Sequence, residues 1–347
     1  MEKRFEDILV IRNGKNQKEV ENPNGKYPIY GSGGIIGYAD DYICEANTIV
    51  LGRKGSINNP IYVEEPFWNV DTAFGLIPKK DYILPKFLYF FCRFYDFEKV
   101  NTTVTIPSLT KRNLLQIKIK VPDFVIQQRI VNILEVIERL MFLYRKEIKY
   151  LEDLIKARFV EMFGVYPANP MGWEIGTIRD IVTEVRYGSS RPAVDGGKYP
   201  YLRMNNITYG GELDLSDTKR IDIPDNELDK CTVRRGDVLF NRTNSKELVG
   251  KTCVYDRDEM MVLAGFVIRT RVKDRILPEF LSAFLNTDFS KQMLLGMCKT
   301  AIGQANINAQ ELQNIGLYLP PVELQRRFVQ FKKETDKSKL MKFIYVA

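Results

Sequence analysis

Two short polar stretches that follow hydrophobic runs carry the side chains of this sequence best suited to chemistry. The first contains Arg53, Lys54, Ser56, Asn58 and Asn59, and the second contains Arg242, Thr243, Asn244, Ser245 and Lys246. Guanidinium and amide groups hydrogen bond to base edges in the major groove of DNA, whereas ammonium and hydroxyl groups contact phosphates. Both stretches are therefore candidate DNA contacts, and the alternative is a pair of polar surface turns.

Three further stretches offer the same mixture of aromatic, hydroxyl, amide and cationic groups. They contain Tyr187, Ser189 and Arg191; Arg203, Asn205 and Asn206; and Lys299, Thr300, Gln304 and Asn306. For each residue of the first two stretches, a structural role is as plausible as a DNA contact. The third has the composition of a loop that contacts phosphate or the minor groove.

The sequence offers little for catalysis. It contains no histidine, which removes imidazole bases and the usual zinc sites, and its five cysteines are scattered without a paired spacing. Asn59-Pro60-Ile61-Tyr62 resembles the base-gripping loop of amino-methyltransferases only in part, and no glycine-rich cofactor loop accompanies it. Asp123, Glu147 and Lys149 are nuclease-type residues, but the last two fall on a predicted helix. We predict no catalytic residues, no metal site and no cofactor bound by this chain.

Length and composition favour two globular domains. The chain has 347 residues, of which 45% are hydrophobic and 27% charged, and its formal net charge is +7. A single core rarely grows to this size, and this charge permits nucleic acid as a partner without requiring it. No apolar run is long enough to cross a membrane, and the N-terminus lacks the pattern of a secretory signal, so we expect a cytoplasmic protein.

The second half of the chain repeats the first. The passage VPDFVIQQRIV at 121–131 returns as LPPVELQRRFV at 319–329, and Ile83-Leu84-Pro85 returns as Ile276-Leu277-Pro278. Lys26-Tyr27-Pro28 returns as Lys198-Tyr199-Pro200, and Arg53 falls opposite Arg242. The offset drifts from 172 to 198 residues along the chain, as insertions in the loops of a duplicated domain would produce.

Each copy combines strand and helix patterns. Runs such as Asn47 to Leu51, Val238 to Phe240 and Phe266 to Val272 are typical of strands. Leu84 to Tyr95 and Leu277 to Met297 begin with proline in the first turn and continue at helical spacing, so we expect one helix in each. The predicted fold class is α+β.

A long helix follows the first copy. From Ile126 to Phe163, apolar residues alternate in steps of four and three, which predicts a coiled-coil helix of roughly 57 Å. We expect it to pack antiparallel to a helix that begins near Pro321, although burial against the globular copies is the alternative. The predicted seam residues are Ile130, Ile133, Ile137, Leu140 and Leu151.

This order of motifs resembles the specificity subunits of type I restriction-modification systems. The residues that carry the resemblance are Gly34 to Gly37, Gly236 to Arg242, Gly303 to Ile307 and the two repeated passages. The resemblance implies target recognition domains at 1–122 and 167–320, a central spacer helix at 123–166 and a distal spacer helix at 321–347. Each domain would read half of a bipartite DNA target, and the two helices would form an antiparallel spacer.

The resemblance also implies partners. They are double-stranded DNA, methyltransferase subunits that carry S-adenosylmethionine, and a restriction subunit. One alternative is an assembly protein that binds methyltransferase subunits without reading DNA. Another is a stand-alone nuclease or methyltransferase, which the missing histidines and the missing cofactor loop oppose.

The chain departs from the family pattern in two places. The first copy has Ile106-Pro107-Ser108-Leu109 where the second has Gly303 to Ile307, so contacts expected at the second segment do not carry over. Adding the repeat offset of 198 residues to Phe163, the end of the first long helix, places the end of an equally long distal helix beyond Ala347. We therefore expect a shortened distal helix, and a second copy of the chain or a methyltransferase subunit covering the unpaired stripe of the first.

Overall fold

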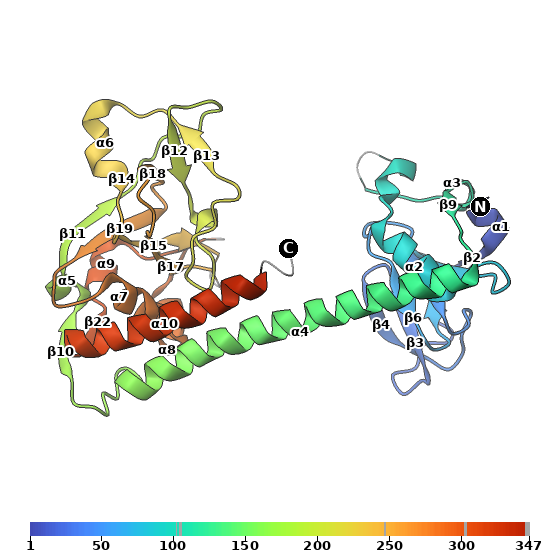
Figure 1. The fold of residues 1–347 in the computed structure, drawn as a ribbon, viewed down its shortest axis with the longest axis horizontal. Helices are drawn as coiled ribbons and strands as arrows, with labels where there is room; N and C mark the ends of the chain where they lie inside the picture. Colours follow the sequence, from blue (N-terminus) through green and yellow to red (C-terminus); the bar gives the residue numbers. More distant parts are fainter. Residues whose placement is uncertain (102, 104–105, 246–247, 302–303, 344–347) are drawn as a thin grey trace. The chain divides into compact units, whose positions relative to one another are not determined.

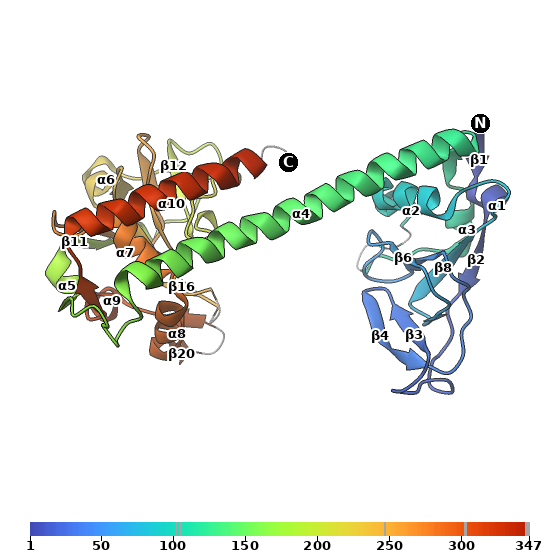
Figure 2. The same ribbon diagram turned by 60° about the horizontal axis from the view of Figure 1, so that its bottom comes forward.

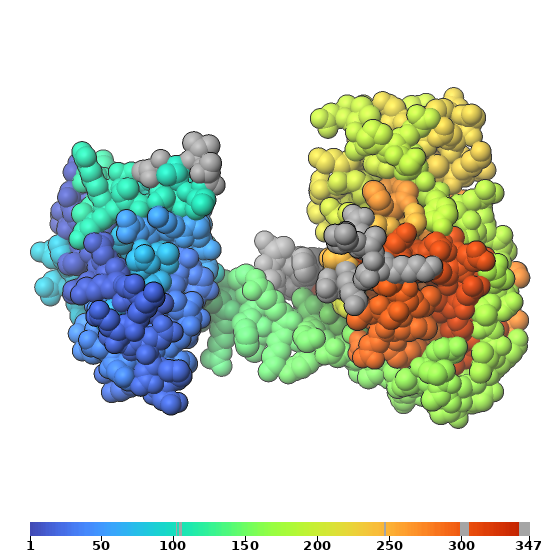
Figure 3. Space-filling model, turned by 180° about the vertical axis from the view of Figure 1, so that it is seen from behind, coloured from blue at the N-terminus to red at the C-terminus, as the bar shows by residue number. Residues whose placement is uncertain are grey.

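The structure is a computed structural model of the chain, and it describes residues 1–347 except 102, 104–105, 246–247, 302–303 and 344–347. Two compact units, Met1–Phe142 and Leu143–Ala347, divide within one long helix, α4 (Phe124–Phe163). Their surfaces are coloured blue to green and green to red in Figure 3, and the elements are labelled in Figure 1.

The first unit contains three sheets and short helices. Its central sheet has the order β2-β8-β5-β6 and a second sheet has the order β4-β3-β7, while β1 pairs with β9. The strands are β1 (Glu2–Arg4), β2 (Leu9–Asn13), β3 (Tyr27–Gly31), β4 (Gly34–Ala39), β5 (Thr48–Gly52), β6 (Ile61–Val63), β7 (Trp68–Asn69), β8 (Ala73–Pro78) and β9 (Lys118–Lys120). The helices are α1 (Phe5–Ile8), α2 (Pro85–Phe94), η1 (Phe97–Val100), α3 (Lys111–Leu115) and the N-terminal part of α4.

The second unit repeats this arrangement with additions. Its sheets have the orders β11-β19-β15-β17, β13-β12-β18-β14, β10-β22 and β16-β21-β20. The strands are β10 (Glu174–Thr177), β11 (Val182–Tyr187), β12 (Tyr199–Leu202), β13 (Lys219–Ile221), β14 (Thr232–Val233), β15 (Val238–Asn241), β16 (Thr243–Asn244), β17 (Thr252–Val254), β18 (Met261–Leu263), β19 (Val267–Val272), β20 (Lys299–Ala301), β21 (Gln304–Asn306) and β22 (Gly316–Leu319). The helices are α5 (Ile178–Ile181), η2 (Met204–Asn206), α6 (Asp225–Cys231), α7 (Pro278–Leu285), α8 (Asp288–Met297), α9 (Ala309–Gln313) and α10 (Val322–Phe343).

The strand pairing of the two units matches in detail. In the first unit Ile49 pairs with Leu76 and Val10 with Ile77. In the second, Val238 pairs with Thr270 and Glu184 with Arg271, at the equivalent positions. Both second sheets contain one parallel pair, β3 with β7 and β12 with β18, beside antiparallel pairing. The predicted α+β class and the duplication are confirmed.

The repeated passage forms the same junction in both copies. Gln127 of α4 is buried, and its Oε1 accepts a hydrogen bond from the backbone N–H of Leu84 at 2.8 Å, while its Nε2 donates to the carbonyls of Tyr82 and Pro122. Leu84 caps the N-terminus of α2, so a helix-end donor is satisfied by a side chain of the next helix.

The second copy repeats each of these bonds. Gln325 accepts from the N–H of Leu277, which caps α7, at 2.8 Å, and it donates to the carbonyls of Arg275 and Pro320. The passage recurs because the same buried amide ties each domain to the helix that follows it.

One helix prediction needs correction. The expected single helix from Leu277 to Met297 is two helices, α7 and α8, separated at Asn286 and Thr287. The hydroxyl of Thr287 accepts a hydrogen bond from the N–H of Ser290 and so begins a new helix. The predicted strands and the helix over Leu84 to Tyr95 are confirmed by β5, β15, β19 and α2.

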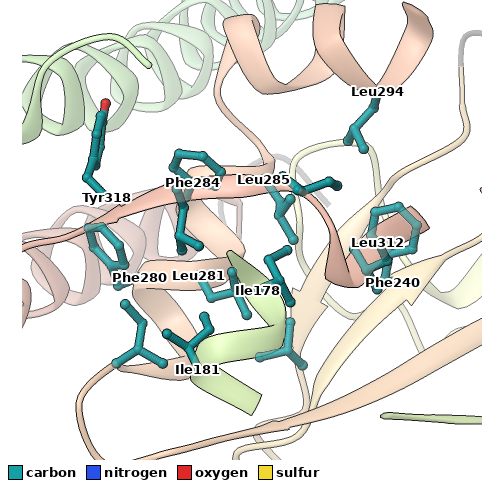
Figure 4. Close-up of a cluster of buried hydrophobic side chains, with 14 of the residues drawn as sticks. Ile178, Ile181, Phe240, Phe280, Leu281, Phe284, Leu285, Leu294, Leu312 and Tyr318 are labelled. Atoms are coloured by element: carbon teal, nitrogen blue, oxygen red, sulfur yellow. The ribbon is translucent and has the colours of Figure 1, made fainter. Parts of the chain in front are cut away.

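The largest core lies in the second unit, around α7. Figure 4 shows Phe280, Leu281, Phe284 and Leu285 of α7 among side chains from the sheet and from α5. Phe159 and Phe163, at the end of α4, join the same core, and both rings pack against Phe328 of α10 at centroid distances of 5.3 and 5.7 Å. Figures 1 and 2 show this end of α4 beside α10, running in the opposite direction.

The predicted seam residues differ in their surroundings. Ile130 borders a groove with α2 in the first unit, because the first turns of α4 pack on their own domain. Ile133, Ile137 and Leu140 are exposed, and Leu151 is half-buried. The aromatic residues that contact α10 in the second unit are Phe159 and Phe163, which the heptad pattern did not single out.

Candidate nucleic-acid interface

Arg53 and Arg242 occupy the same place in the two copies. Each follows the last residue of the central strand, β5 or β15. The N–H of Arg53 donates to the carbonyl of Thr72 at 2.8 Å, and its carbonyl accepts from the N–H of Leu109 at 2.9 Å. Arg242 makes the equivalent bonds with Phe266 at 3.0 Å and Ile307 at 2.9 Å. The backbone therefore fixes the same starting point for both guanidinium groups.

An aromatic ring lies beneath each guanidinium. The Arg53 guanidinium carbon is 5.7 Å from the centroid of the Phe74 ring, and that of Arg242 is 4.8 Å from the Tyr187 ring. The Tyr187 hydroxyl accepts a hydrogen bond from the N–H of Ala309, which fixes the ring. Such stacking orients a guanidinium while leaving its edge donors free for a bidentate contact with guanine or phosphate.

A small sheet surrounds Arg242 in the second copy. β16, which holds Thr243 and Asn244, pairs with β21, and β21 pairs with β20. The Thr243 hydroxyl donates to the side chain of Asn306 at 3.2 Å. The backbone of Lys299, Thr300 and Gln304 lies in the same sheet, and Ser245 follows β16 exposed to solvent. Two parts of the prediction, Lys246 and Gly303, lie outside the described residues.

The equivalent loop of the first copy is simpler. Lys54 forms an isolated bridge with Ser108, and the N–H of Gly55 donates to the carbonyl of Pro107. Lys54, Ser56 and Asn59 are exposed and so available for contact. Asn58 is also exposed, but its Oδ1 accepts from the N–H of Phe97 at 2.7 Å and its Nδ2 donates to Asp96, so it holds η1 in place.

Four other candidates are engaged within the protein. Ser189 and Asn206 are buried, and the Asn206 side chain bonds to three backbone groups. Arg191 pairs with both carboxylate oxygens of Glu227, and Arg203 pairs with Asp217 at 2.8 Å. A guanidinium already paired with a carboxylate must exchange that partner to contact DNA. Asn205 remains exposed.

The structure therefore brings together one group of the predicted residues: Tyr187, Arg242, Thr243, Asn244 and Asn306. Sequence reasoning missed Phe74 and the supporting role of Tyr187, because they lie on β8 and β11, strands far in sequence from the arginines that they contact. One sequence signal for this close packing was available, because a glycine follows the equivalent strand in each copy. Gly14 and Gly188 follow β2 and β11, and an added Cβ would lie 1.8 Å from the carbonyl oxygen of Val70 or 2.2 Å from that of Leu263. The chain approaches its neighbour too closely there for any side chain.

No group of three or more histidine, cysteine, aspartate or glutamate side chains could hold a metal ion in the part of the chain that the structure describes. In that same part, no helix has both the length and the apolar character needed to span a membrane.

Known proteins resemble this chain in sequence and share its duplicated fold. A specificity subunit of the type I restriction enzyme EcoKI from Escherichia coli is 29% identical over 154 residues, which is 43% of this chain and 33% of that protein. A type I specificity subunit homologue from Methanocaldococcus jannaschii is 27% identical over 171 residues, 48% of this chain and 40% of that protein. The chain thus aligns with less than half the length of these relatives.

Solved structures share the fold. A type I restriction-modification S subunit from M. genitalium aligns over 100% of this chain and 94% of its own, with a TM-score of 0.53 and 17% identity. A structure described as showing complex assembly and conformational transition of the type I R-M system aligns over 99% and 92%, with a TM-score of 0.58 and 17% identity. The family described as the type I restriction modification DNA specificity domain matches residues 1–153 and 170–344, so the chain belongs to that family.

Proposed function

We propose that this chain is the DNA-recognition subunit of a type I restriction-modification complex. Each copy reads one half of a bipartite target, and the helices α4 and α10 hold the two readers and bind methyltransferase subunits. The restriction subunit joins through that assembly. The chain performs no chemistry of its own, and S-adenosylmethionine is bound by the methyltransferase partner. A protein that reads chromosomal DNA in this way works in the cytoplasm.

The observation that carries this proposal is the equivalence of Arg53 and Arg242. Two domains with the same strand order present an arginine from the same backbone position, each over an aromatic ring. A DNA target with two separate half-sites requires two such readers on one chain. Membership of the DNA specificity family supports the same function.

A non-reading assembly protein is the second candidate. This candidate is favoured by the ion pairs of Arg191 and Arg203 with carboxylates of the same domain, because these two guanidinium groups are then not available for DNA contacts. The exposed Lys54, Ser56 and Asn59 of the first copy argue against it. The two candidates differ in whether the complex selects a DNA sequence.

Mapping of methylated bases tests the proposal. The chain would be expressed with its methyltransferase subunit in a host that lacks type I methylation, and the genome would be sequenced for methyladenine. We expect one bipartite motif to be methylated at both half-sites. Complex formation without any sequence-dependent methylation would favour the assembly protein, and no complex formation would contradict both.

A further inference from the structure

The first unit contains a cavity that lies apart from the arginine loop, the loop that begins at Arg53. It has a volume of about 510 Å³ and lies between β6, α2 and the first turns of α4. Its walls are the aromatic side chains of Tyr30, Tyr62, Tyr89 and Phe90. Figures 1 and 2 show α2 beside this part of α4.

Carboxylates form the rim of this cavity. Glu64, Glu65, Glu135 and Glu138 all border it, and Lys86 is its one basic lining residue among those described. The Lys86 ammonium lies 2.6 Å from Glu135 and 3.4 Å from Glu64, and Arg93 pairs with Glu138 from outside the lining. Four carboxylates thus exceed the two cations that contact them, so the rim repels phosphate and attracts a further cation.

One tyrosine among the lining residues is largely buried. Tyr30 lines the cavity and is 9% exposed. Burial, together with the charge of Glu65, raises the pKa of Tyr30 above its ordinary value, so the hydroxyl keeps its proton at neutral pH. A hydroxyl in this position gains a hydrogen bond when a ligand with a polar group enters.

Lys86 is an example of a cation bound by the cavity. The Lys86 ammonium lies 5.7 Å from the centroid of the Tyr62 ring and pairs with the carboxylates of Glu64 and Glu135. Aromatic faces combined with carboxylates bind ammonium and guanidinium groups, and guanidinium also stacks flat on such faces.

Strand direction places this cavity away from the DNA-contacting loop. Tyr62 pairs with Ile49 near the start of β5, whereas Arg53 follows its end. The four residue-to-residue steps from Ile49 to Arg53 span roughly 13 Å at about 3.3 Å per step. The cavity and the arginine loop therefore lie at opposite ends of one strand, and the cavity instead adjoins α4.

The second copy lacks this cavity chemistry. Its register places Leu202, Val254, Ser282 and Ala283 where the first copy has the four aromatic residues. The ion pair is reversed as well, because Glu279 and Lys333 pair at 3.4 Å where the first copy has Lys86 and Glu135. The aromatic, acidic cavity is thus a specialisation of the first copy and not part of the repeated framework.

We propose that this cavity binds an arginine or lysine side chain of the methyltransferase subunit. The inference rests on the proposed function and specifies one of its contacts: the cation stacks on the aromatic walls, pairs with Glu65 and donates to the Tyr30 hydroxyl. It predicts that this contact belongs to the first copy alone.

Binding of the purified methyltransferase subunit to the full chain tests this proposal. Three variants are compared with wild type: Glu65→Lys, Tyr30→Phe and the matched control Glu19→Lys, which places the same charge at an exposed site outside the cavity. We expect Glu65→Lys to weaken binding about tenfold or more and Tyr30→Phe about threefold to tenfold, with no change for Glu19→Lys. Raising the salt concentration should weaken wild-type binding more than binding by Glu65→Lys.

A second readout separates this contact from DNA recognition. With saturating methyltransferase subunit, all three variants should methylate the same bipartite motif as wild type. Unchanged affinity in both Glu65→Lys and Tyr30→Phe, with folding confirmed by circular dichroism, would overturn the cavity proposal and leave the proposed function standing. A wild-type chain that does not bind the subunit would overturn both.

Discussion

The two copies share a framework but are stabilised differently at its centre. In the second copy, Arg269 and Arg271 of β19 pair with Glu184 and Asp237, and Arg269 is 1% exposed. At the equivalent positions the first copy has Gly75, Ile77, Val10 and Thr48. Identical strand pairing is therefore compatible with either a buried ion network or a mostly apolar sheet.

The copies also differ in what covers the helix that follows each sheet. In the second copy, Phe159 and Phe163 fill the angle between α7 and α10, against Phe280 and Phe328. In the first copy the equivalent angle between α2 and α4 is an open groove of about 300 Å³, bordered by Phe87, Phe91 and Ile130, and its Phe94 is 75% exposed. The comparison teaches that the repeat fixes backbone and junctions, while side-chain packing evolved separately in each copy.

The largest expected effect is loss of the ion network in the second copy. Asp237→Ala should lower the free energy of unfolding by about 3 to 5 kcal/mol, because it leaves two largely buried arginines with one carboxylate. Thr48→Val, the matched change in the first copy, should alter it by less than about 1 kcal/mol, since the Thr48 hydroxyl is buried without a partner among the described residues. Urea denaturation of both variants measures this, and equal losses would contradict the comparison.

The junction glutamines should matter equally in both copies. Gln127→Ala and Gln325→Ala each leave a buried N–H and two carbonyls without their side-chain partner, so each should cost about 1 to 3 kcal/mol of stability. Gln128→Ala is the control, because Gln128 is exposed and bonds only to Asn132 on its own helix. A large difference between the first two variants would show that the junctions are not equivalent.

The paired arginines should affect DNA recognition in opposite halves of the target. Arg53→Ala and Arg242→Ala should each lose about 1 to 3 kcal/mol of binding free energy, and each should relax base preference at one half-site only. Binding of the methyltransferase complex to DNA libraries randomised in either half measures this. A uniform loss of affinity with preference retained would assign these residues to phosphate contacts.

The smallest expected effect is a difference in acid sensitivity. Burial raises the pKa of Glu184, but the hydrogen bond from Arg186 and the charges of Arg269 and Arg271 outweigh it, so the pKa in the folded protein lies below its ordinary value of 4.5. A lowered pKa contributes stability that is present above about pH 4.5 and is lost as the pH falls below it. Glu184→Gln should therefore flatten the acid limb of the stability curve. As the pH falls, hydrogen exchange should detect the loss of stability in the second unit before it detects one in the first unit.

Much of the fold followed from the sequence because repetition made weak signals agree. Short strands such as β5 and β15 were predictable since two copies supported one assignment. The break between α7 and α8 was not, because one capping hydroxyl at Thr287 outweighed a continuous apolar pattern. The arginine pair was found by alignment of the copies, whereas Phe74 and the cavity around Tyr30 depend on pairing between distant strands, which no local pattern encodes. The groove that Ile130 forms with α2 was not predictable either, because it depends on how the first turns of α4 pack on their own domain.

The repeated junction has an evolutionary consequence. Among the described residues, the side chains of Gln127 and Gln325 bond only to backbone groups. These groups lie at the turn ahead of α2 or α7 and at the proline two residues before α4 or α10. The bonds therefore do not depend on which side chains the domain carries elsewhere. Recombination within the repeated passage would exchange one domain for another and leave the connection intact. Under the proposed function, new combinations of half-sites would then arise in a single genetic event without redesign of the interior.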